Sequence, residues 1–146
     1  MEIKDIKKVA CIGAGVIGYS WAVGFALKEL EVALYDINDD VLKLAQSRVH
    51  ESLNLLIRNQ IVTEEERTQI EGRITYTTSI KEAVTGAGFI QESGPEHYDI
   101  KHEIIKEIET YANPEAIIAS STSRKSQRTQ KILNVLLEDI LITHLI

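Results

Sequence analysis

Short apolar runs recur along the chain and are separated by longer segments of mixed polarity. Continuous apolar runs of this length are typical of strands that are buried on both faces of a parallel sheet. We expect such strands at residues 8–12, 32–35, 74–77, 88–92 and 116–119. Between most of these runs, apolar residues stand three or four positions apart, which is the spacing of one helix face.

This spacing predicts four helices. The first follows a group of glycines and ends near Leu30, and the second runs from Val41 to Ile57 behind Asn38, a good N-cap residue. A capping box at residues 63–66 opens a shorter helix, and isoleucines at residues 100–108 form the apolar stripe of the fourth. Strands that alternate with helices predict an α/β fold with a Rossmann-type, doubly wound, mainly parallel sheet.

Composition narrows the class of protein. The chain has 146 residues, a length that fits one domain, and its 16 basic and 22 acidic residues give a net charge of −6. This balance argues against a nucleic-acid partner or an anionic membrane surface, since both need a basic field. No apolar run approaches the ~20 residues of a membrane span, and the N-terminus lacks the apolar stretch of a signal peptide. We expect a cytoplasmic protein.

The cysteine and histidine positions predict no metal site. Cys11 stands alone, so the chain has neither an internal disulfide nor a cysteine-rich zinc site, and we interpret it as a small core residue. The four histidines show no metal-ligand spacing: His50, His97, His102 and His144.

Charge also divides the chain. Residues 124–131 include four basic residues and no acid, and the residues after them are mostly apolar. We therefore expect residues 1–123 to form the main part of the domain and residues 124–146 to form an atypical C-terminal tail of the same domain.

The glycines lie in a pattern that has a chemical reason. Gly13, Gly15 and Gly18 follow the first predicted strand and open the first predicted helix, in the order G-x-G-x-x-G. Gly13 permits a tight turn, Gly15 leaves room for a pyrophosphate near the backbone, and Gly18 allows close packing of the helix. The phosphates then lie at the N-terminus of the helix, with Ala14, Val16 and Ile17 completing the loop.

Asp36 ends the second predicted strand, where a carboxylate accepts hydrogen bonds from the hydroxyls of an adenosine ribose. A carboxylate there repels a 2′-phosphate, and Ile37 and Asn38 supply no compensating arginine. The cofactor is therefore predicted to be NAD rather than NADP. A bare strand-to-helix turn, a methyltransferase and a FAD-binding protein are the alternatives, although a flavoprotein usually has Glu in place of Asp36.

Several segments together resemble one family. Residues 8–18, 34–37, 74–75 and 116–120 are similar to the NAD-binding domain of the 3-hydroxyacyl-CoA dehydrogenase family, over a region of about residues 7–123. Residues 18–26, 90–96 and 120–123 resemble the branch of lambda-crystallin (gulonate 3-dehydrogenase) and carnitine dehydrogenase. The implied substrate is a 3-hydroxyacyl-CoA or a small polar 3-hydroxy acid such as carnitine or gulonate.

The resemblance implies NAD-dependent oxidation of a secondary alcohol to a ketone, in which a histidine base takes the hydroxyl proton. His144 matches that base, and Ser123 matches a serine that binds the substrate oxygen. Glu96 and Lys101 resemble positions near the nicotinamide and the substrate phosphate. The resemblance also implies that a full-length parent protein is a homodimer.

The end of the chain departs from the family pattern. His144 is followed only by Leu145 and Ile146, and residues 124–137 do not resemble the corresponding family segment. The glutamate partner of the base and the helical substrate domain are absent from the sequence. Our hypothesis is a truncated product with a shift of reading frame near Arg124, which would be an NAD-binding module without a complete active site.

Overall fold

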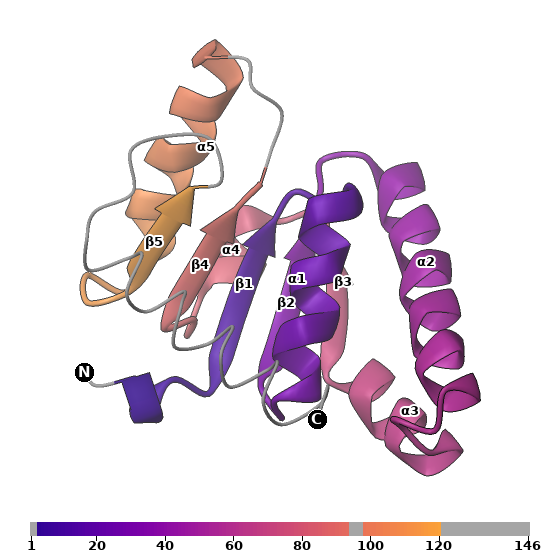
Figure 1. Cartoon of the computed structure of the whole chain (residues 1–146). Coiled ribbons are helices and arrows are strands. Elements are labelled where there is room, and N and C mark those ends of the chain that lie inside the picture. Colours follow the sequence, from indigo (N-terminus) through magenta and orange to yellow (C-terminus); the bar gives the residue numbers. More distant parts are fainter. Residues whose placement is uncertain (1–2, 94–97, 121–146) are drawn as a thin grey trace.

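The structure, a computed structural model, describes residues 3–93 and 98–120. Within these residues, five parallel strands form one sheet in the order β3-β2-β1-β4-β5, with helices on both faces (Figure 1). The predicted Rossmann-type α/β fold is confirmed. The elements, in chain order, are η1 (Ile3–Asp5), β1 (Lys8–Ile12), α1 (Val16–Leu27), β2 (Glu31–Tyr35), α2 (Asp39–Arg58), α3 (Glu64–Gly72), β3 (Ile74–Thr77), α4 (Ile80–Val84), β4 (Phe89–Glu92), α5 (Tyr98–Tyr111) and β5 (Ile117–Ser120).

Most predicted elements agree with the structure to within a few residues. Asn38 caps α2, because its side-chain oxygen accepts hydrogen bonds from the backbone N–H groups of Asp40 and Val41. The capping box that opens α3 is also present. The first helix ends at Leu27 rather than near Leu30, and the chain turns at Glu29, which adopts a left-handed φ of 64°.

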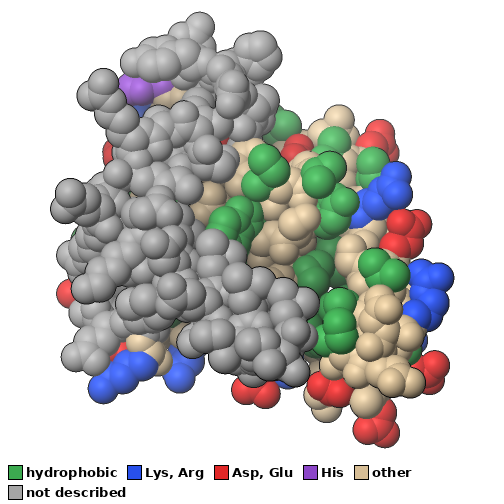
Figure 2. All heavy atoms as spheres, viewed as in Figure 1, with side chains coloured by type: hydrophobic (Ala, Val, Ile, Leu, Met, Phe, Trp, Pro, Cys, Tyr) green, Lys and Arg blue, Asp and Glu red, His purple; other side chains and the backbone are tan. Residues whose placement is uncertain are grey.

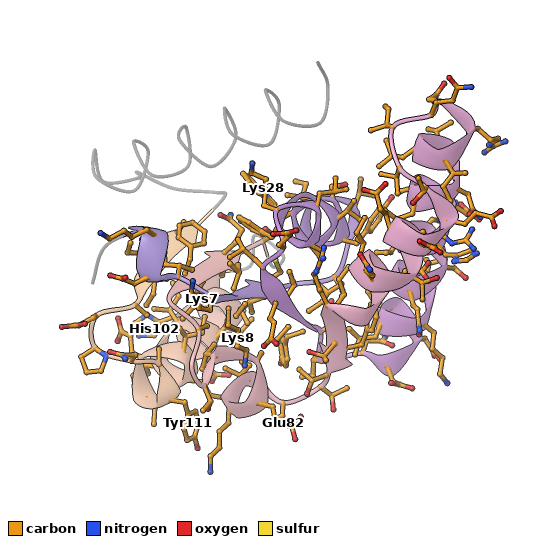
Figure 3. The ribbon with its side chains drawn as sticks, turned by 90° about the horizontal axis from the view of Figure 1, so that it is seen from below. Lys7, Lys8, Lys28, Glu82, His102 and Tyr111 are labelled. Atoms are coloured by element: carbon orange, nitrogen blue, oxygen red, sulfur yellow. The ribbon has the colours of Figure 1, made fainter. Side chains whose placement is uncertain are left out.

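Helix α4, which has only five residues, was not predicted from the sequence. It is too short to show an apolar stripe at helical spacing. A signal was nevertheless present, since Ser79 stands three residues before Glu82, the spacing of a capping pair. In the structure the Ser79 hydroxyl accepts a hydrogen bond from the Glu82 backbone N–H at 3.2 Å. At the other end of α4, the Lys8 ammonium donates to the carbonyls of Glu82 and Thr85 (Figure 3).

Two apolar layers enclose the sheet. Helices α1, α2 and α3 cover one face, and α4 and α5 cover the other (Figure 1). In the first layer, the fully buried Phe25 ring of α1 stacks on Trp21 at 5.5 Å and meets Phe89 of β4 at 5.9 Å between ring centroids. Burying one such ring contributes about 1.5–3 kcal/mol to the free energy of folding. This packing holds the C-terminal half of α1 against the sheet beside the start of β4.

Two further findings apply to the described residues alone. No helix within residues 3–93 and 98–120 has the length and apolar character needed to cross a membrane. In the same residues, no three side chains of the types that bind metals come together as a metal site would require.

Candidate functional site: a dinucleotide-binding loop

The strand order reverses between β1 and β4. Because all five strands are parallel, their carboxyl ends lie at one edge of the sheet, and this edge beside a reversal is where open α/β sheets bind ligands. The glycine loop lies at this edge, between β1 and the N-terminus of α1 (Figure 1). The Ser93 N–H donates to the Ile12 carbonyl at 2.8 Å, which joins the loop after β4 to the end of β1.

Gly13 makes the turn out of β1. Its φ of 105° is a conformation that residues with a Cβ rarely adopt, so glycine is required there. The Gly13 N–H donates to the Tyr35 carbonyl at 2.8 Å and thereby extends the pairing of β1 with β2 by one residue. The turn therefore begins from a fixed point at the end of the sheet.

Gly18 allows the close packing that its position predicted. A Cβ at Gly18 would lie 1.7 Å from the Gly13 carbonyl oxygen and 2.7 Å from its carbon, far inside any permitted contact. Both atoms belong to the backbone, so no side-chain rotation relieves the overlap. The first turn of α1 therefore rests directly on the glycine loop.

Gly15 has the opposite environment. It is the N-cap residue of α1, with a φ of −68°, and a Cβ built on it would meet no atom of the described residues within 4 Å. The open space lies at the N-terminus of a helix of 12 residues whose first turn holds no acidic residue. An anion placed there meets free backbone N–H groups and the positive end of the helix dipole. The residues present thus fit a dinucleotide pyrophosphate.

Asp36 lies directly beyond β2 and faces this loop. One carboxylate oxygen accepts a hydrogen bond from the Ala14 N–H at 3.0 Å, and the other accepts from the Asn38 N–H at 3.0 Å. Each oxygen keeps further lone-pair capacity, which suits the hydroxyls of a ribose. Beside it, Ile37 has 83% of its surface exposed and offers no positive charge to a 2′-phosphate.

Apolar side chains also reach the surface over α1 and α2 (Figure 2). Val16 and Ile17, at the start of α1, are 70% and 56% exposed. They flank the open space at Gly15, and a bound dinucleotide would remove part of their surface from water.

Comparison with known proteins decides the family. The family model of the 3-hydroxyacyl-CoA dehydrogenase NAD-binding domain matches residues 8–143. The chain belongs to this family. Its cofactor is NAD, in agreement with the prediction. The match extends past Ser123 into the segment that the sequence analysis separated as an atypical tail, and the boundary after Ser123 stays a prediction.

The relatives also agree with the predicted branch of the family. An L-carnitine dehydrogenase/betainyl-CoA thioesterase of Agrobacterium fabrum is 40% identical over 119 residues, which cover 80% of this chain and 23% of that protein. A human lambda-crystallin homolog is 34% identical over 120 residues, covering 79% of this chain and 36% of that protein. This chain therefore spans about a quarter to a third of the length of these relatives.

Solved structures of the family share the fold. The (S)-3-hydroxybutyryl-CoA dehydrogenase PaaH1 of Ralstonia eutropha superimposes with a TM-score of 0.77 at 29% identity, covering 88% of this chain and 45% of that one. A 3-hydroxybutyryl-CoA dehydrogenase of Escherichia coli has the same TM-score at 25% identity, covering 84% of this chain and 26% of that one.

The structure brings together only some of the residues singled out in the sequence. Residues 13–18 and Asp36 meet at one place. Glu96, Ser123 and His144 lie outside the described residues, as does the segment 124–146. Lys101 belongs to α5, but the described part of the structure does not include its side chain.

Two polar residues near the site were missed by the sequence analysis. Gln91 and Glu92, at the carboxyl end of β4, are 1% and 0% exposed. The side-chain carbonyl oxygen of Gln91 and the Ser93 hydroxyl have no hydrogen-bond partner among the described residues. Polar residues at the end of an apolar strand are the signal that could have marked them in the sequence. When such groups are buried, they are costly unless each has a hydrogen-bond partner.

A second polar region lies on the α1 face of the sheet, where α2, α3 and β3 form a cleft of about 530 Å³. His50 of α2 contacts Glu71 of α3 there at 2.5 Å, with half of its side chain exposed. The pKa of the Tyr76 hydroxyl is raised to about 12. Burial is the larger cause, and the charge of Glu71 is the smaller one. The contact of His50 with Glu71 is a finding of the structure.

Proposed function

We propose that this chain is the cofactor-binding part of a dehydrogenase that oxidises a 3-hydroxy acid, or its CoA thioester, to the 3-oxo compound. The observation that carries the proposal is the open space at Gly15, bounded by the N-terminus of α1 and by Asp36. NAD supplies the hydride acceptor when it is bound. Family membership supports this reaction class.

The residues have distinct proposed roles. The backbone of residues 13–18 binds the pyrophosphate, and Asp36 binds the adenosine ribose and disfavours a 2′-phosphate. By resemblance alone, His144 is the base that takes the hydroxyl proton, Ser123 binds the substrate oxygen, and Glu96 and Lys101 lie near the nicotinamide and the substrate phosphate. A full-length parent protein is proposed to be a homodimer on the same ground.

The identities favour a small polar substrate over an acyl-CoA. The carnitine dehydrogenase of Agrobacterium fabrum is 40% identical to this chain, whereas the two 3-hydroxybutyryl-CoA dehydrogenase structures are 25% and 29% identical. We therefore propose carnitine or a similar 3-hydroxy acid as the first substrate to test.

A second candidate function is NAD binding without catalysis by residues 1–146 alone. The two histidines of the described residues, His50 and His102, lie on α2 and α5, and neither belongs to a loop that follows a strand (Figure 3 labels His102). Without an oriented base and a pocket that aligns the substrate with the nicotinamide, hydride transfer is slow.

Two measurements on the purified 146-residue chain test these proposals. Fluorescence titration is expected to show tight binding of NADH, with NADPH much weaker; equal affinities would refute the assigned role of Asp36. A spectrophotometric NADH assay with carnitine, gulonate and 3-hydroxybutyryl-CoA is expected to show no appreciable turnover. A rate of ~1 per second or more would show that residues 1–146 contain a working active site.

A further inference from the structure

We infer that Asp36 is also a positioning residue: its carboxylate holds the glycine loop in the shape that receives the pyrophosphate, before any cofactor binds. The inference rests on the proposal that this loop is the pyrophosphate site. This positioning role is separate from the proposed contact of Asp36 with the ribose. Only the positioning role affects the loop of the protein without cofactor.

The loop is attached to the end of β2 by two consecutive N–H groups. The Gly13 N–H donates to the backbone carbonyl of Tyr35, which continues the pairing of β1 with β2. The next N–H, that of Ala14, donates to the side chain of Asp36 at 3.0 Å. The carboxylate thus takes the place of a backbone acceptor where the chain has turned away from the strand. Ala14 is 2% exposed, so water does not readily replace this acceptor.

The carboxylate is itself held in place. Its second oxygen accepts the Asn38 N–H at 3.0 Å, and the Asn38 side chain in turn caps α2. A group bonded through both oxygens cannot rotate freely, so Asp36 links the start of α2 to the glycine loop. A carboxylate held in this way has little rotational freedom to lose when the cofactor arrives.

The loop is also confined by α1. The first turn of α1 rests on the Gly13 carbonyl, since Gly18 has no Cβ to separate them. The loop backbone therefore has two contacts, one with α1 at Gly13 and one with the Asp36 carboxylate at Ala14. Loss of the carboxylate removes the second contact and leaves the first.

Hydrogen exchange without cofactor separates this role from ribose binding. In the wild-type chain, NMR is expected to show slower exchange for the Ala14 amide than for the amides of Val16 and Ile17, which lie in the first helical turn. In Asp36→Ala, the Ala14 amide is expected to exchange roughly 10- to 100-fold faster, the range for loss of a hydrogen bond to a charged group. The Cys11 amide, inside the sheet, is expected to stay protected.

A matched control removes a nearby charge without touching the loop. Asp40→Asn alters an exposed acid in the first turn of α2, and its Ala14 exchange is expected to equal that of wild type. Ala14 exchange within about twofold of wild type in a folded Asp36→Ala variant would overturn the inference. Fast Ala14 exchange in the wild-type chain would overturn it even if no Asp36 variant folds. Failure of the wild-type chain to bind NADH would instead refute the proposed function.

Discussion

The glycine loop and the cleft between α2, α3 and β3 both present polar groups to solvent, but from different sources. In the loop they are backbone N–H groups, placed by the turn at Gly13 and by the start of α1. In the cleft they belong mainly to side chains, and several already have partners: His50 contacts Glu71 within the cleft, and Lys43 pairs with Asp39, which lies outside its lining, at 3.3 Å.

This difference explains why a cleft of about 530 Å³ is the weaker candidate for the cofactor site. Long exposed side chains lose rotamer freedom when they hold a ligand, and the paired groups must first give up their partners. The loop donors lose little, because the backbone geometry already fixes them. For cofactor binding, preorganised hydrogen-bond donors therefore matter more here than the volume of the cleft.

The largest expected effect is on the contact between the loop and α1. Gly18→Ala forces a Cβ to within 1.7 Å of the Gly13 carbonyl oxygen unless the helix moves, and we expect a loss of about 3 kcal/mol or more in the free energy of unfolding. Urea unfolding followed by circular dichroism measures it. Gly15→Ala is the matched control, because its Cβ meets open space, and it is expected to cost at most about 1 kcal/mol. Equal costs in both variants would contradict the close packing.

The second-largest expected effect is on the affinity for NADH. Gly15→Val is expected to keep the fold, since no atom in the described part of the chain lies within 4 Å of the Cβ, but to fill the space of the pyrophosphate. We expect roughly a hundredfold or greater loss of affinity for NADH, equivalent to two or more charge-assisted hydrogen bonds. Fluorescence titration of a variant with a wild-type circular dichroism spectrum provides the measurement. Wild-type affinity in that variant would mean that the phosphates bind elsewhere.

A smaller change is expected in the preference for NADH over NADPH. Asp36→Ala removes the proposed ribose acceptor and the charge that opposes a 2′-phosphate, so the preference for NADH over NADPH is expected to narrow by roughly 10- to 100-fold. Titrations of both cofactors measure this ratio. An unchanged ratio would indicate that Asp36 does not face the ribose.

The smallest effects are expected in the cleft. Glu71→Gln breaks the half-exposed pair with His50 and is expected to cost at most about 1 kcal/mol, with NADH affinity unchanged. A clear loss of NADH affinity would contradict our separation of the cleft from the cofactor site.

Glu71→Gln is also expected to lower the pKa of Tyr76 from about 12 toward its ordinary value of 10, but not fully, because burial is the larger cause of the shift. In the wild type, the folded state keeps Tyr76 protonated to a higher pH than the unfolded state does, so the free energy of unfolding is expected to fall as the pH rises from about 10 to about 12. Phenolate absorbance during titration tests this, with Tyr76→Phe as the control that lacks the step. An unchanged Tyr76 pKa in Glu71→Gln would contradict the influence of Glu71.

The sequence by itself was enough to predict the sheet, the glycine loop and the acid at position 36. Each of these signals is local: a strand appears as an apolar run, and the caps at Asn38 and Thr63 act on N–H groups two or three residues away. Hydrogen bonds over such short separations depend on neighbouring residues alone. The family resemblance followed from the same segments and is confirmed.

Tertiary structure decided the contacts between residues that are distant in sequence. Helix placement brings His50 to Glu71, 21 positions later, and the pairing of β1 with β2 brings Asp36 to the Ala14 amide, 22 positions earlier. No local pattern encodes which partner such a side chain meets, because the meeting depends on how the elements pack. The sequence thus predicted that Asp36 stands at the cofactor site, and only the packing of β1 against β2 revealed that its carboxylate holds the loop.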